Sequence, residues 1–260
     1  MSSFVVYPAI DLRKGRVVRL AQGDPSRETT YSLDPVLVAQ DWQAAGATWL
    51  HVVNLDGAFG EVASVGATES GNLQALAAMM EFPLSVQFGG GLRDLAAVAR
   101  AVELGVSRVV LGTAFVEEPD FVVAALNKFG PERVAVGIDA REGVAQIRGW
   151  RKPTALLAVD LAQRWADLGG RWLIFTDISR DGMGSGVNVE ATVALARETG
   201  LSVIASGGVR TLADVRRVRD AGLAGVIIGR ALYEGQVLLQ DALALGQEFA
   251  DLRNETAKEE

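Results

Sequence analysis

A long internal repeat constrains the fold of this chain more than any other feature of its sequence. Residues 86–117 return without a gap as residues 203–234, and about 13 of the 32 aligned positions are identical. An ungapped match of this length is typical of a duplicated structural unit. We therefore expect the same arrangement of strands and helices to occur twice.

Each copy has the pattern of a strand, a helix and a second strand, with glycine where each strand ends. Asp94 and Thr211 are predicted to be the N-caps of the two helices. The glycines concerned are Gly90, Gly91, Gly112, Gly207, Gly208 and Gly229. Glycine lets a backbone approach a ligand closely, and the first N–H groups of a helix bind anions. Tight turns alone could also explain the glycines, but their repetition favours two phosphate sites.

The composition excludes several kinds of chemistry. The 260 residues include no cysteine and one histidine, His51, so a thiolate nucleophile, a disulfide and a multi-histidine metal site are ruled out. Proton transfer is left mainly to carboxylates. The net charge of −7 disfavours binding to nucleic acid, although backbone N–H groups and a few arginines can still hold a small anion.

The two halves of the chain also match outside the long repeat. The segment AIDL at 9–12 is echoed by GIDA at 137–140, which gives Asp139 the position of Asp11. We therefore predict an α/β fold, a single (β/α)8 TIM barrel over residues 1–250 with half-barrels of about 1–127 and 128–250. An open doubly wound sheet is the alternative, but the dinucleotide fingerprint is absent and two matching halves favour closure. Residues 251–260 are expected to be a polar tail.

Several boundaries are expected from local patterns. The first strand is predicted at 4–10 and is followed by a polar loop of about twenty residues that contains Arg13, Lys14 and Arg19. A helix is predicted from about Thr68 to Met80. The chain has no apolar run near the ~18 residues that span a membrane, and residues 1–12 lack the features of a signal peptide, so we expect a cytoplasmic protein.

The two aspartates carry the predicted chemistry. In a (β/α)8 barrel the active site lies at the carboxyl ends of the strands, so Asp11 after strand one and Asp139 after strand five should face each other. Each could instead cap a helix, but their symmetry favours a shared role. A substrate with a phosphate at each end would then place its middle between two carboxylates, an arrangement suited to isomerisation by paired acid and base catalysis.

The motifs of the chain resemble those of one known family, phosphoribosylformimino-5-aminoimidazole carboxamide ribotide (ProFAR) isomerase of histidine biosynthesis. The matching segments are PAIDL at 8–12, GRVVRLAQGD at 15–24, HVVNLDGA at 51–58, QFGGGLRD at 87–94, VVLGTA at 109–114, VGIDAR at 136–141, RGW at 148–150, TDISRDG at 176–182, SGGVR at 206–210 and IIGRALYEG at 227–235. The resemblance implies an Amadori rearrangement of the aminoaldose ProFAR to the aminoketose PRFAR. It further implies a bisphosphorylated small-molecule substrate, no cofactor and no metal.

The resemblance also implies roles for individual residues. Asp11 would remove the C2 proton of the sugar, Asp139 would protonate the ring oxygen, and Thr176 would assist them. The expected substrate contacts are Arg19, Trp150 and Asp181. The expected phosphate contacts are Gly90, Gly91, Gly112 and Thr113 in one site and Gly208, Gly229 and Arg230 in the other. His51 is expected to be structural or to lie behind the reacting groups, and Asn54 replaces the aspartate that is usual in the family.

Three alternatives stay open. A dual-substrate isomerase that also acts on phosphoribosylanthranilate would use the same site. The sister barrel that cyclises to imidazole glycerol phosphate shares both aspartates, but it usually has a cysteine before the first of them, where this chain has Ala9. A barrel that only binds phosphorylated metabolites is disfavoured because both aspartates are present. We expect a monomer with no nucleic-acid or membrane partner.

Overall fold

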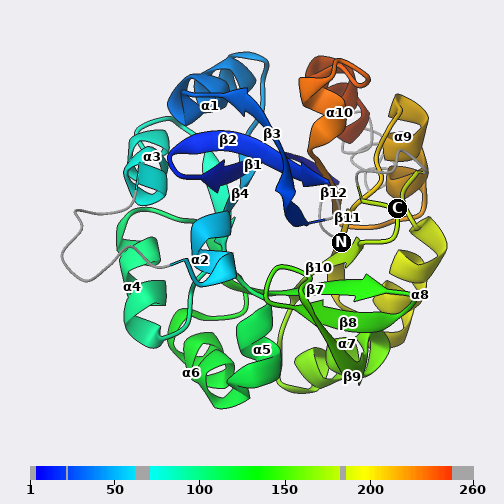
Figure 1. Ribbon diagram of the computed structural model, residues 1–260. Coiled ribbons are helices and arrows are strands. Elements are labelled where there is room, and N and C mark those ends of the chain that lie inside the picture. The colour runs from blue at the N-terminus through cyan, green and yellow to red at the C-terminus, as the bar shows by residue number, and fades with distance from the viewer. Residues whose placement is uncertain (1–3, 22, 62–70, 182–185, 248–260) are drawn as a thin grey trace, which may run out of the picture.

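The computed structural model describes residues 4–21, 23–61, 71–181 and 186–247. Eight parallel strands form a closed barrel, in which β7 pairs with β10 and β12 pairs with β1 (Figure 1). The barrel strands are β1 (Val5–Arg13), β4 (Trp49–Asn54), β5 (Ser85–Gly89), β6 (Arg108–Leu111), β7 (Val134–Arg141), β10 (Trp172–Asp177), β11 (Ser202–Ser206) and β12 (Gly225–Ile228). The predicted (β/α)8 TIM barrel is confirmed. The predicted tail at 251–260 lies outside the described residues.

Helices connect the strands and surround the barrel (Figure 1). They include α1 (Pro35–Ala44), α2 (Leu55–Phe59), α3 (Gly71–Met79), α4 (Leu95–Glu103), α5 (Thr113–Glu117), α6 (Pro119–Phe129), α7 (Ala158–Asp167), α8 (Val189–Thr199), α9 (Leu212–Asp220) and α10 (Arg230–Tyr233). Both predicted caps are confirmed: Asp94 accepts from the N–H of Ala97 at the start of α4, and Thr211 forms a capping box with Asp214 at the start of α9. Among the described residues, no helix has the length and apolar character needed to cross a membrane.

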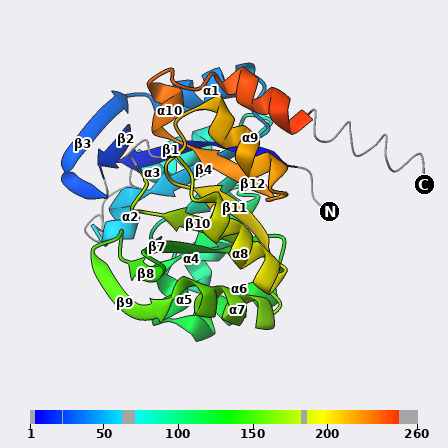
Figure 2. The same cartoon turned by 90° about the vertical axis from the view of Figure 1, so that its right-hand side faces the viewer.

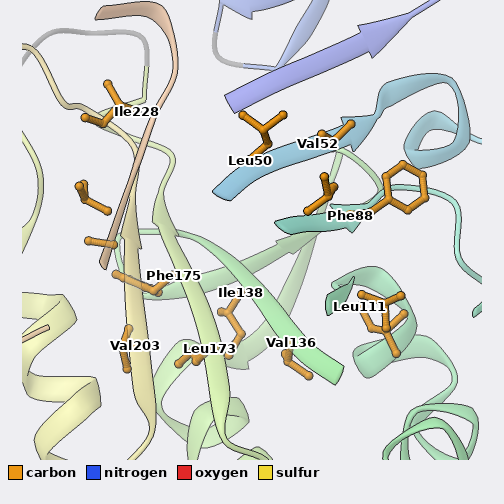
Figure 3. Packing of buried hydrophobic residues seen from close by; sticks show 14 of the residues in the cluster. Leu50, Val52, Phe88, Leu111, Val136, Ile138, Leu173, Phe175, Val203 and Ile228 are labelled. Atoms are coloured by element: carbon orange, nitrogen blue, oxygen red, sulfur yellow. The ribbon is translucent and has the colours of Figure 1, made fainter. Parts of the chain in front are cut away.

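The main core lies between the barrel and its helices. Because side chains alternate along a strand, Leu50 and Val52 of β4 face outward, where they join residues such as Phe88 and Leu173 in one buried cluster (Figure 3). Each such side chain contributes about 1.5–3 kcal/mol on full burial. The alternate positions face the barrel interior, and these are the positions that lead up to the site.

The segment after β1 differs from the sequence prediction. Instead of a long polar loop, β1 extends to Arg13 and pairs with the antiparallel strand β2 (Arg16–Ala21), which pairs with β3 (Asp24–Ser32). Lys14 and Gly15 turn the chain with φ of 50° and 74°, the positive values that a tight type I′ hairpin requires. Arg19 therefore lies on a strand, which limits where its side chain can reach.

A second hairpin follows β7 at the matching place in the other half. Its strands are β8 (Val144–Ile147) and β9 (Lys152–Leu157), and its turn residues Glu142 and Gly143 have φ of 51° and 79°. Figure 2 shows both hairpins at the same end of the barrel. The site is thus walled by one hairpin from each half.

Two smaller differences concern helices. The short helix α2 was not predicted, and Asn54 begins it by accepting a hydrogen bond from the N–H of Gly57. The helix expected from about Thr68 is described from Gly71 to Met79, and residues 62–70 are outside the described part of the chain. Asn54 thus has a local structural role as a helix cap.

Candidate active site

One large cavity opens at the carboxyl ends of the barrel strands and has a volume of about 750 Å³. Every residue that the sequence assigned to the site lines it. These residues are Asp11, Arg19, Gly90, Gly91, Gly112, Thr113, Asp139, Trp150, Thr176, Asp181, Gly208, Gly229 and Arg230. The fold thus brings together residues that are as much as 219 positions apart in the chain (230 minus 11).

The two aspartates lie on opposite sides of this cavity. Asp11 is on β1 and Asp139 on β7, which are the first and fifth of the eight barrel strands in circular order. Asp139 is paired in register with Thr176 on the neighbouring strand β10. A ligand in the cavity would therefore meet a carboxylate on each face.

Asp11 has a cation as its direct partner. The Arg19 guanidinium donates to Asp11 Oδ2 over 2.6 Å. Burial raises the pKa of the Asp11 carboxyl above its ordinary value, Arg19 partly offsets this, and the Asp181 carboxylate adds to the rise. Arg19 therefore favours the ionised form of Asp11, the form that can accept a proton.

Asp139 has neutral hydrogen-bond partners instead. Burial raises the pKa of the Asp139 carboxyl, hydrogen bonds from Thr176 and Trp150 lower it, and the Asp181 charge raises it again. None of these causes is a cation, so the proton on Asp139 is retained to higher pH than on an ordinary aspartate. Two carboxyl groups in unlike surroundings are typical of an acid and base pair.

Asp181 connects the two sides. Its Oδ1 lies 3.7 Å from Arg19 Nη2, and its charge raises the pKa of both Asp11 and Asp139. Asp181 itself is buried. Its position therefore suits it to hold Arg19 in place while it disfavours ionisation of the nearby carboxyl groups.

The segment that carries Trp150 is conformationally strained. Arg148, Gly149 and Trp150 have φ of 57°, 65° and 68°, and this left-handed region costs a non-glycine residue about 1–3 kcal/mol. Contacts with neighbouring elements hold the segment there. The N–H of Arg148 donates to Thr113 Oγ1 over 2.8 Å, and the Arg148 guanidinium donates to Glu117 of α5 over 2.9 and 3.1 Å.

We expect Glu117→Gln to weaken this hold and to raise KM or lower kcat by about two- to fivefold, in keeping with the small contribution of an exposed ion pair. The reason is that Glu117 also accepts from Lys152 over 3.3 Å, so a single carboxylate holds a residue on each side of Trp150. Steady-state kinetics at low and high salt measure the effect, which salt should reduce in the wild type. Glu103→Gln removes an exposed charge from α4 and should change neither constant. Equal behaviour of the two variants would contradict the prediction.

The first glycine pair fits closely against α2 and its cap. A Cβ on Gly90 would lie 2.2 Å from the carbonyl oxygen of Asn54, and Gly90 has a φ of 97°. Gly112 precedes α5, and Thr113 is its first residue. The glycines therefore place backbone N–H groups of two neighbouring loops at one side of the cavity.

The second copy repeats this arrangement. A Cβ on Gly207, which matches Gly90 in the repeat, would lie 2.9 Å from the carbonyl oxygen of Asp177, and one on Gly208 would lie 2.5 Å from that of Gly186. Gly229 precedes α10 as Gly112 precedes α5. The space beside Gly229 is occupied by Arg19, whose Cζ would be 2.7 Å from a Cβ there. Arg230, the first residue of α10, adds a second guanidinium at this side.

Gly90→Ala should destabilise the protein by more than ~1–3 kcal/mol, because a clash with the Asn54 carbonyl adds to the cost of an unfavourable φ. Thermal unfolding of the variant measures the loss. Gly222→Ala is the matched control, since Gly222 also has a positive φ of 76° but a Cβ there would meet nothing within 4 Å. If both variants lost the same stability, the contact with Asn54 would carry none of it.

Sequence reasoning missed Glu117 and Phe59 and gave His51 only a structural or supporting role. His51 and Glu117 line the cavity, and Phe59 of α2 packs under Gly149, where a Cβ would be 2.4 Å from its ring. Asn54 does not line the cavity; Asn72 donates to its Oδ1 over 2.8 Å. The alternation of β4 was the available signal, since it turns His51 and Val53 inward and Asn54 outward.

The fold and cavity define a class: a (β/α)8 barrel with paired carboxyl groups and two glycine-rich loops at the carboxyl ends of its strands. The chain belongs to the family described as histidine biosynthesis protein, whose sequence profile matches residues 5–238. The family resemblance seen in the motifs is thereby confirmed.

Curated relatives are similar over nearly their full length. A protein of Granulibacter bethesdensis is 50% identical over 236 residues, which cover 90% of this chain and 94% of the relative. A protein of Roseiflexus castenholzii is 50% identical over 242 residues (93% and 99%), and one of Moorella thermoacetica is 46% identical over 245 residues (93% and 98%). All three are named 1-(5-phosphoribosyl)-5-((5-phosphoribosylamino)methylideneamino) imidazole-4-carboxamide isomerase.

Proposed function

We propose that this chain is an aldose–ketose isomerase that converts ProFAR to PRFAR in histidine biosynthesis. The observation that carries the proposal is the pair of buried aspartates with unlike partners, set between two glycine-rich loops. Asp11 is paired with Arg19, and Asp139 is held by Thr176 and Trp150. The names of the relatives support the same reaction.

The environments of the aspartates suggest their roles. Asp139, which keeps its proton to higher pH, acts as the acid that protonates the ring oxygen and opens the sugar to a Schiff base. Asp11, which Arg19 keeps ionised, removes the C2 proton that the Schiff base has acidified. The electron pair of the broken C2–H bond forms the C1–C2 double bond of an enolamine, and the pair of the C=N bond returns to the Schiff-base nitrogen. Loss of the proton from the C2 hydroxyl and protonation of C1 then give the aminoketose. Thr176 and Asp181 position these groups, and Trp150 closes the cavity above them.

The glycine loops are proposed to hold the two phosphates of the substrate. Gly90, Gly91, Gly112 and Thr113 form one site through backbone N–H groups, and Gly208, Gly229 and Arg230 form the other. We expect inorganic phosphate to compete with the substrate and to raise KM without lowering kcat. Substrate titrations at several phosphate concentrations measure this, with chloride at equal ionic strength as the control. An unchanged KM would refute the phosphate loops.

Turnover by the purified chain tests the function directly. ProFAR and phosphoribosylanthranilate are supplied in parallel, and the products are separated and identified. Conversion of ProFAR alone is expected. Conversion of both would make the chain a dual-substrate isomerase, which the names of the relatives do not favour. A folded chain that converts neither would exclude the proposal.

We also propose that the chain works as a monomer in the cytoplasm, as its sequence led us to expect. Both statements stay predictions. Light scattering during gel filtration would measure the molar mass in solution, and a mass near 27.5 kDa would agree with a monomer.

A further inference from the structure

A row of polar side chains crosses the barrel interior below the cavity. Arg108 of β6, Gln87 of β5 and His51 of β4 occupy partnered positions on three adjacent strands, His51 with Gln87 and Gln87 with Arg108. Arg108 is 4% exposed and Gln87 fully buried. Burying polar groups this deep in a barrel costs free energy unless each has a hydrogen-bond partner. The hydrogen bonds between these side chains therefore define which atoms donate and which accept.

Arg108 fixes the direction of the hydrogen bonds along this row of three side chains. Arg108 Nη1 lies 3.1 Å from Gln87 Oε1, and because a guanidinium can only donate, the amide oxygen of Gln87 must face it. The amide nitrogen then faces His51 and donates to Nδ1 over 3.0 Å. His51 Nδ1 therefore accepts, and the proton of the neutral ring resides on Nε2.

The arginine is itself held firmly. Its guanidinium lies 3.8 Å from the centre of the Trp172 ring and 4.9 Å from that of Trp49. It also donates to the Tyr7 hydroxyl over 3.5 Å and to the carbonyl oxygen of Glu132 over 3.4 Å. Arg108 is thus a fixed reference for the orientation of Gln87.

His51, at the other end of this row, reaches the cavity. The cavity floor consists of the inward-facing residues one step below the uppermost layer of the barrel. Those that line the cavity are Ala9, His51, Val110, Gly137, Ile174 and Ile227. In this floor set, His51 has the only polar side chain. Burial and the nearby Arg19 lower the pKa of His51 to about 3, so the ring stays neutral at the pH of metabolism.

We propose that Gln87 and Arg108 are positioning residues that lock His51 as the Nε2-protonated neutral tautomer, and that this N–H donates to a ribose hydroxyl of the substrate beside Asp11. The proposal rests on the proposed function, which it deepens by naming the group that orients the sugar. A neutral donor serves this role because an imidazolium would add a second cation to Arg19 near Asp11, lower the pKa of the carboxyl further and weaken the carboxylate as a base.

Charged groups around His51 set the conditions for a test. Arg19 approaches from β2 and Asp11 from β1, while Arg108 stands behind Gln87 on β6. Asp139 and Asp181 line the same cavity. The substitution Gln87→Glu would replace the amide donor by a second acceptor, so His51 would have to carry a proton on Nδ1.

Because the chain has one histidine, nuclear magnetic resonance of the full protein labelled with nitrogen-15 in histidine reports on His51 alone. We expect a protonated Nε2 and an unprotonated Nδ1 that do not change between about pH 5 and 8. A ring protonated on Nδ1, or one that titrates in this range, would overturn the proposal. This readout needs no substrate, so it stands or fails independently of the proposed function.

Two variants extend the test to the reaction. Gln87→Glu should move a proton to Nδ1 of His51 and lower kcat about tenfold or more. Gln87→Met, similar in volume, should leave His51 free to adopt either neutral tautomer and should lower kcat by a similar factor. In both, competition by inorganic phosphate should be unchanged, since the glycine loops are untouched. Retention of the wild-type tautomer and of wild-type kcat in folded Gln87→Glu protein would refute the role of Gln87.

Discussion

Asp139→Asn should lower kcat by on the order of 10²–10⁴-fold, the contribution typical of a positioned general acid. The amide keeps the shape of the side chain and can still meet Thr176 and Trp150, but its N–H groups are too weakly acidic to protonate the ring oxygen. Folding should be preserved, because burial already disfavours the charge that the substitution removes. Thermal unfolding and steady-state turnover measure the two effects separately.

The pH profile makes this prediction specific. In the wild type the rate should fall on the alkaline side as Asp139 loses its proton, and since its pKa is raised, this limb lies at higher pH than for an ordinary aspartate. The residual activity of Asp139→Asn should lack the limb. Asp160→Asn, which changes an exposed aspartate of α7, should keep both the rate and the limb. An alkaline limb that survives in Asp139→Asn would assign the acid to another residue.

Asp11→Asn should also lower kcat by on the order of 10²–10⁴-fold, through loss of the base that removes the C2 proton. The wild-type rate should fall on the acidic side as Asp11 takes up a proton, at higher pH than for an ordinary aspartate because its pKa is raised. Substitution leaves Arg19 with Asp181 as its charged partner at 3.7 Å, so the guanidinium is not left without a carboxylate. We therefore expect the variant to fold.

Hydrogen exchange at C2 separates the two aspartates. In heavy water the wild type should exchange the C2 proton of the substrate with solvent, and Asp11→Asn should not. The variant Arg19→Met is a useful comparison, because it keeps the Asp11 carboxylate but removes the neighbouring cation. It should shift the acidic limb of the pH profile to higher pH. Exchange at the wild-type rate in Asp11→Asn would show that another group removes the proton.

The architecture could be predicted from the sequence because each copy of the repeat could be compared with the other. The glycines that end the strands, together with Asp94 and Thr211, occur at the same offsets in both copies, so the units could be recognised without reference to long-range contacts. The two hairpins were not predicted because their turns lack the usual sequence signal. Their turns are Lys14-Gly15 and Glu142-Gly143, which lack the asparagine or aspartate that usually marks a type I′ turn.

The candidate site was predictable as a set of positions but not as a set of interactions. Strand ends converge in any parallel barrel, so Asp11 and Asp139 could be placed on opposite sides. The partners that distinguish them could not be placed, because Arg19 reaches Asp11 through a hairpin and Trp150 reaches Asp139 through left-handed residues. For the same reason the alignment of His51 with Gln87 became visible only in the register of the strands.

The close fit of the glycine loops restricts how such a protein can diverge. Gly90 and Gly208 each lie so near a neighbouring carbonyl that any side chain there would displace the backbone, so single substitutions at these points cannot simply reshape the ends of the cavity. The outer hairpin strands β3 and β9 are mostly exposed and have no such restriction along most of their length. New substrate preferences in descendants of this barrel should therefore arise first in these outer hairpin strands, while the glycine loops at the ends of the cavity stay unchanged.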